Sequence, residues 1–92
     1  MAVQVRIPTP MRGLTQNQAR VDVAGDTVAE VFAELDRKFP GIRQNLYDEN
    51  GSLRSFINVF VNEEDIRHLE GDKTAVKAGD EIAIMPAIAG GR

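Results

Sequence analysis

The residues with the clearest chemical potential stand at the end of the chain, in Ala89-Gly90-Gly91-Arg92. Glycine has no Cβ, so two consecutive glycines let a backbone pass through a channel too narrow for side chains and present a carbonyl group to another protein's active site. The terminus itself is therefore a candidate reactive group, with Ala89 and Gly90 as the segment that threads such a channel. A frayed end is the alternative interpretation, because chain termini are commonly disordered.

The composition of this 92-residue chain limits the other chemistry that is available. It has no cysteine, which excludes disulfides, thiolate metal sites and a cysteine nucleophile. The lone histidine, His68, has no second histidine with which to share a metal, so we expect no metal site. The glycines match no nucleotide-binding motif. With 14 acidic and 11 basic residues and a net charge of -3, the chain lacks the basic surface of a nucleic-acid binder, and we expect proteins as partners.

The sequence also predicts where the protein acts. It contains neither the features of a signal peptide nor an apolar run that approaches the roughly 20 residues needed to cross a bilayer. We therefore expect a cytoplasmic protein without membrane contact. Its length and its 42% hydrophobic and 27% charged residues are those of a single globular domain.

Alternating patterns predict that the N-terminal part of the chain is β-structure. Apolar and polar residues alternate over positions 2–7 until Pro8 and Pro10 end the pattern, and they alternate again over positions 19–23. We expect these two strands to form a hairpin across a short polar stretch in which Gly13 is the turn residue.

A helix follows, and it is the most secure element in the sequence. Thr27 with Glu30 three residues later forms a capping box, in which each side chain accepts a hydrogen bond from a free backbone N–H at the helix start. Pro40-Gly41 ends the helix. The apolar residues recur at helical spacing and form one stripe that should face a sheet: Val28, Val31, Phe32, Leu35 and Phe39.

The second half of the chain supplies the remaining strands. Residues 41–55 read as an irregular connection with one helical turn at Ile42–Leu46. Three strands follow: Phe56–Val61, a short strand at Asp65–Arg67, and Glu81–Met85.

This order of elements predicts an α+β domain, a mixed sheet of four to five strands with one main helix on one face. It fits the β-grasp, or ubiquitin-like, arrangement, in which the last strand lies centrally beside the first. We assign residues 1–86 to the domain and 87–92 to a flexible C-terminal tail. Strand parity places Phe60 and Met85 on the face away from the helix, where they are candidates for docking a partner; burial beneath a loop is the alternative.

Several segments together resemble the ThiS/MoaD sulfur-carrier family, and within it most closely the carriers of the thiocarboxylate route to cysteine. The resemblance covers nearly the whole chain and is specific because the segments occur in combination. They are Ile7-Pro8-Thr9, Gly25-Asp26-Thr27, the run from Val59 to Arg67, Ala78-Gly79-Asp80, and the run from Ile84 to Gly91.

The resemblance implies a carrier protein that is not itself an enzyme and binds no resident cofactor. In the family, a relative of ubiquitin-activating enzymes adenylates the terminal glycine with ATP, and a sulfur donor protein displaces AMP to leave a thiocarboxylate. Gly91 matches that glycine. An acceptor synthase, with a cysteine synthase as one candidate, then takes the sulfur. The family alternatives are a small subunit of molybdopterin synthase and a thiamine-type carrier.

Arg92 departs from the family pattern because it blocks the carboxylate of Gly91. We expect a processing peptidase to cleave between Gly91 and Arg92 and release that carboxylate. Two alternatives from another class remain open: a ubiquitin-like modifier of lysines, and a non-covalent interaction domain that keeps Arg92.

Overall fold

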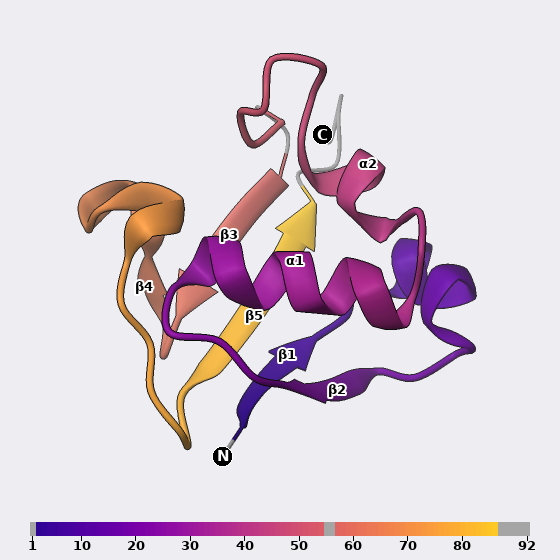
Figure 1. Cartoon of the computed structure of the whole chain (residues 1–92), viewed down its shortest axis with the longest axis horizontal. Helices are drawn as coiled ribbons and strands as arrows, with labels where there is room; N and C mark the ends of the chain where they lie inside the picture. Colours follow the sequence, from indigo (N-terminus) through magenta and orange to yellow (C-terminus); the bar gives the residue numbers. More distant parts are fainter. Residues whose placement is uncertain (1, 55–56, 87–92) are drawn as a thin grey trace.

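A computed structural model of the chain describes residues 2–54 and 57–86. They form one five-stranded mixed sheet in the order β2-β1-β5-β3-β4, with helix α1 packed across one face (Figure 1). The strands are β1 (Val3–Arg6), β2 (Arg20–Val23), β3 (Ile57–Val61), β4 (Glu64–Asp65) and β5 (Glu81–Pro86). The central position of β5, parallel to β1 and antiparallel to β3, confirms the predicted β-grasp arrangement.

Helix α1 (Val28–Lys38) begins and ends where the sequence predicts. The Thr27 side chain accepts a hydrogen bond from the Glu30 N–H at 3.2 Å. The return bond differs by one residue from the predicted capping box, because the Glu30 carboxylate accepts from the Asp26 N–H, at 3.0 Å, and not from Thr27. Gly25 is required just before this cap, since a Cβ there would lie 2.7 Å from the Val31 side chain.

The core lies between α1 and the sheet. Four residues of the predicted helical stripe are fully buried, and Phe39, just after the helix, is partly buried against them. Inward residues of every strand from β1 to β3 and of β5 complete this core, while the residues between them along each strand face away from α1.

The short helix α2 (Ile42–Leu46) confirms the predicted helical turn and is fastened to the core through Tyr47. The Tyr47 ring packs edge-on against Phe32 with centroids 6.3 Å apart, and its hydroxyl donates to Asp72 at 3.1 Å. Burial, with the neighbouring Asp72 carboxylate, raises the pKa of the Tyr47 hydroxyl, so the phenol stays protonated and keeps this donor role.

Two segments differ from the sequence prediction. The stretch between β1 and β2 is a 3-10 helix, η1 (Thr9–Thr15), anchored by buried Met11 and Thr15, and is not simply a polar loop. The predicted strand at residues 65–67 is only the two-residue β4, followed by the 3-10 helix η2 (Ile66–His68). The reason is local: the Asp65 carboxylate accepts the Arg67 N–H at 2.8 Å and turns the chain out of the sheet. A third 3-10 helix, η3 (Gly71–Lys73), follows η2 in the connection to β5.

Candidate functional site

The root of the C-terminal tail is the end of β5, and the sheet holds this strand on both sides. Ile82 and Ile84 are buried in the core. At the start of the strand, the side chain of Asn62 accepts a hydrogen bond from the Glu81 N–H and donates one to the Asp80 carboxylate, both at 3.0 Å. The Asn62 bond, with a second from the Lys77 backbone, holds the pKa of Asp80 below its usual range. The tail therefore starts from a fixed point.

Pro86 is the last residue of this strand. It pairs with Ile57 of β3, so the sheet extends one residue further than Met85, where the sequence analysis ended it. Because proline has no N–H, it cannot extend the hydrogen-bonded ladder as a donor. Gly91, with Ala89, Gly90 and Arg92, lies outside the described residues.

The two predicted docking residues are neighbours on the sheet face away from α1. Phe60 lies opposite Ala83, and Met85 follows two residues later on the same face of β5. Phe60 is half-buried, whereas Met85 is 51% exposed and is the most exposed large apolar side chain among the described residues. Phe60, Ala83 and Met85 together form what we call the outer apolar patch. Docking at this patch stays a prediction.

A polar cluster borders one side of the outer apolar patch. Arg67 donates to the side chains of Asn58 and Asp65, and Asp65 lies opposite Phe60 in the sheet. These hydrogen bonds hold the pKa of Asp65 below its usual range, so its carboxylate stays ionised at neutral pH and paired with Arg67.

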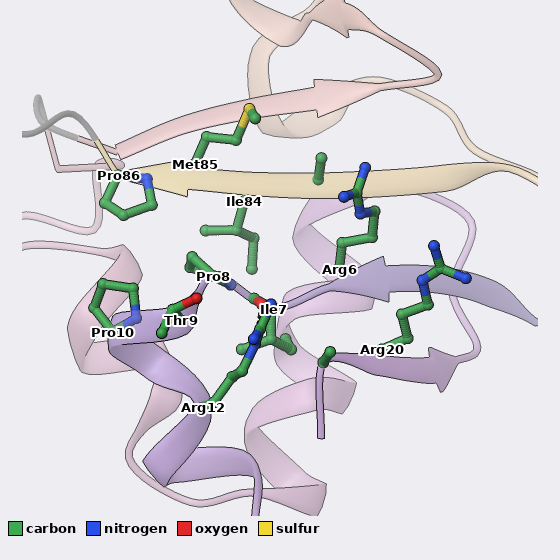
Figure 2. A pocket seen from close by; sticks show the side chains of 12 residues that line it. Arg6, Ile7, Pro8, Thr9, Pro10, Arg12, Arg20, Ile84, Met85 and Pro86 are labelled. Atoms are coloured by element: carbon green, nitrogen blue, oxygen red, sulfur yellow. Dashed lines mark hydrogen bonds between the residues drawn. The ribbon is translucent and has the colours of Figure 1, made fainter. Parts of the chain in front are cut away.

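On its other side the patch continues into a groove of about 510 Å³. It is lined by the segment Arg6–Pro10, by Arg12, by Ala19 and Arg20, and by the end of β5 from Ala83 to Pro86. Figure 2 shows Arg6, Arg20 and Met85 extending on the same side of the sheet. The sequence analysis did not identify this arginine-lined groove, because it depends on strand register; the outward parity of Arg6 and Arg20 was its only signal.

The described residues contain no group of three or more histidine, aspartate or glutamate side chains placed to hold a metal ion. His68 is exposed on η2. Among the described helices, none is long and apolar enough to span a membrane. The described site is thus the end of strand β5 with an apolar patch and an arginine-lined groove beside it.

Comparisons with known proteins agree with this description. The profile of the ThiS family matches residues 5–91. The chain is 42% identical to the sulfur carrier protein CysO of Mycobacterium tuberculosis over 99% of this chain and 100% of the relative. It superimposes with a TM-score of 0.92 on a chain of the BexX/CysO complex of Amycolatopsis orientalis, at 42% identity, covering 98% of this chain and 100% of that one.

A further solved neighbour is the small archaeal modifier protein 1 of Methanosarcina acetivorans, with a TM-score of 0.83 and 31% identity over 98% of this chain and 96% of that one. The chain belongs to the ThiS family. It is a sulfur carrier protein of the ubiquitin-like β-grasp class and not an enzyme.

Proposed function

We propose that Gly91, once Arg92 has been removed, is adenylated and converted to a thiocarboxylate that donates sulfide in biosynthesis, with cysteine as the product. The observation that carries this proposal is the family match, which ends at Gly91 and leaves Arg92 beyond it. The fold supports it, because the central strand β5 ends at Pro86. The five residues from Ala87 to Gly91 can extend about 17 Å beyond that point, enough to reach a recessed active site.

The chemistry needs two steps, both catalysed by partners. A carboxylate oxygen of Gly91 attacks the α-phosphorus of ATP and pyrophosphate leaves, which gives an acyl adenylate. A sulfide-level nucleophile, delivered by a sulfur donor protein, then attacks the carbonyl carbon and AMP leaves, so the thiocarboxylate forms with no change in the oxidation state of carbon. An acceptor synthase receives the sulfur. ATP is available in the cytoplasm, where we place this chemistry.

A second candidate is a protein modifier, because a small archaeal modifier protein shares this fold at 31% identity. In that case the acyl adenylate would pass to a lysine amine, forming an isopeptide bond. A molybdopterin synthase subunit and a thiamine-type carrier would use the same thiocarboxylate with other acceptors.

Intact mass measurements on two chains test the proposal. The full chain and a chain ending at Gly91 are each incubated with the adenylating enzyme of the same organism, ATP and sulfide. Every described element lies at or before Pro86, so loss of Arg92 leaves the domain intact. The shorter chain should gain the mass difference between sulfur and oxygen, and the full chain should do so only after a peptidase removes Arg92. A shorter chain that is never adenylated would overturn the proposal, and lysine conjugates without thiocarboxylate would favour the modifier.

Met85 should contribute to docking and little to folding. Met85→Glu places a charge on a side chain that is 51% exposed beside the tail root, so we expect a raised KM for the adenylating enzyme with an unchanged denaturation midpoint. Leu69→Glu is the matched control, because Leu69 is 43% exposed and follows η2. Phe60→Glu should also weaken docking, at some cost in stability since Phe60 is half-buried. Equal KM values for the Met85 and Leu69 variants would exclude the outer apolar patch as the docking site for the adenylating enzyme.

A further inference from the structure

The arginine-lined groove beside Pro86 contains two arginines placed in a way that does not favour folding. Arg6 of β1 lies directly opposite Arg20 of β2. The hydrogen bond from the Ile7 N–H to the Ala19 carbonyl, at 2.8 Å, makes the next pair, Arg6 and Arg20, a non-hydrogen-bonded one, in which side chains approach most closely. Like charges directly opposite each other in a sheet are destabilising.

No ion pair in the described part of the chain includes Arg6 or Arg20. The two ion pairs there are Arg37 with Glu34 and Arg67 with Asp65. Arg12, at the end of the groove, donates its Nε–H to the Ile7 carbonyl at 3.1 Å. The groove lining, as described, holds these three arginines and no acidic residue, although acidic residues outnumber basic ones in the whole chain.

One acidic side chain on this sheet face, Asp65, lies beyond β3 and is paired with Arg67. Two others lie further from Pro86 than the arginines do. Asp22 and Glu81 are both paired with Gln4, one outward position before Arg6, about 7 Å along the strand. The part of the face formed by β2, β1 and β5 is therefore divided by charge along the strand direction, with the arginines in the groove that Pro86 also lines. A protein that binds the chain beyond Pro86 therefore comes close to this positive part.

We propose that Arg6 and Arg20 bind acidic side chains at the entrance of the adenylating enzyme's tail channel and so steer the carrier onto that enzyme. This inference rests on the proposed function. The adenylating enzyme is favoured over the acceptor because its reaction brings the carboxylate of Gly91 toward the phosphates of ATP, an approach between like charges. An attractive contact outside the channel offsets that repulsion and raises the rate of encounter.

Single charge reversals test this, in the chain ending at Gly91. Arg6→Glu and Arg20→Glu should each lower kcat/KM for adenylation by about 10-fold or more at low salt, through KM with kcat unchanged. The denaturation midpoint should stay the same or rise, because each change replaces a like-charge pair with an opposite-charge one. Lys73→Glu, an equal charge change on exposed η3, should leave kcat/KM unaltered.

Salt dependence gives a second test. The KM of the chain ending at Gly91 should rise with added NaCl, and the KM of the two arginine variants should respond less, because exposed charges are screened as the Debye length shortens. A salt-independent KM, or arginine variants that match Lys73→Glu, would overturn the inference while leaving the carrier function intact. A defect confined to transfer to the acceptor would also overturn it. Failure of the chain ending at Gly91, without any substitution, to become adenylated would instead refute the proposed function.

Discussion

In the chain that ends at residue 91, replacing Gly91 by valine is expected to abolish sulfur loading while the domain stays folded. The proposed reaction needs the carboxylate of Gly91 within reach of ATP inside a channel that admits only backbone, and a branched side chain excludes the terminus from that channel. A displacement of about 1 Å from the reactive geometry can cost about 100-fold in rate, so we expect at least that loss in the rate of adenylation. Intact mass and pyrophosphate release measure it.

Gly13→Val is the matched control for this change. Gly13 lies in η1, and a Cβ at that position has no heavy atom within 4 Å, so valine fits there without a steric clash. Both variants should unfold at a midpoint close to that of the unmodified chain, and only the Gly91 variant should fail to load. Normal loading of Gly91→Val would show that the terminus reacts in an open site, and the role assigned to the Gly-Gly pair would be wrong.

The elements that the sequence predicts well are those determined by local signals. Helix α1 has a capping threonine at Thr27 and a complete apolar stripe, and both act within a few residues. Strand β5 has alternating inward residues, Ile82 and Ile84, that are confirmed as buried. The order of the elements predicted that β5 lies at the centre of the sheet, because connections between elements are short and unknotted, which leaves few possible topologies for this order.

The features that the sequence analysis did not predict depend on contacts between distant segments or on strand register, and the alternation of apolar and polar residues shows neither. The 3-10 helix η1 begins after Pro8 and contains Gly13, and such residues usually indicate a loop. What stabilises it is tertiary, because the side chains of Met11 and Thr15 are buried in the folded domain. The alternation of Arg6 with buried neighbours was visible, but its position opposite Arg20 required the register of two strands.

The candidate site divides in the same way. Residue type and the family resemblance predict Gly91, which stays a prediction. Strand parity, with a helix on the inward face, predicts that Phe60 and Met85 share the other face, and the strand register agrees. The groove between β1, β5 and η1 is lined by segments that are more than 60 residues apart in the chain. An alternating sequence pattern shows which residues of a strand face outward, but it does not show which outward residues of different strands are neighbours. Parity predicts the face, whereas register decides the neighbours on that face.

Replacing Leu35 by alanine is expected to lower the free energy of unfolding by about 2–5 kcal/mol. Leu35 is 0% exposed at the contact between α1 and the sheet, so the truncation leaves a cavity that close-packed neighbours cannot fill completely. Urea denaturation should show a lower midpoint with an unchanged slope, since the folded and unfolded surfaces stay the same.

Two variants of the same helix make this result specific. Arg37→Ala removes a side chain that is 77% exposed and its ion pair with Glu34, which should change stability by no more than about 0.5 kcal/mol. Leu35→Met nearly conserves the side-chain volume, so this variant should keep most of the stability that Leu35→Ala loses.

Because α1 packs on the sheet face away from the groove and the outer apolar patch, the folded fraction of Leu35→Ala should bind the adenylating enzyme with an unchanged KM. An unaltered midpoint for Leu35→Ala would contradict the assignment of this helix face to the core, and a raised KM in the folded fraction would show that core packing also sets the geometry of the tail root.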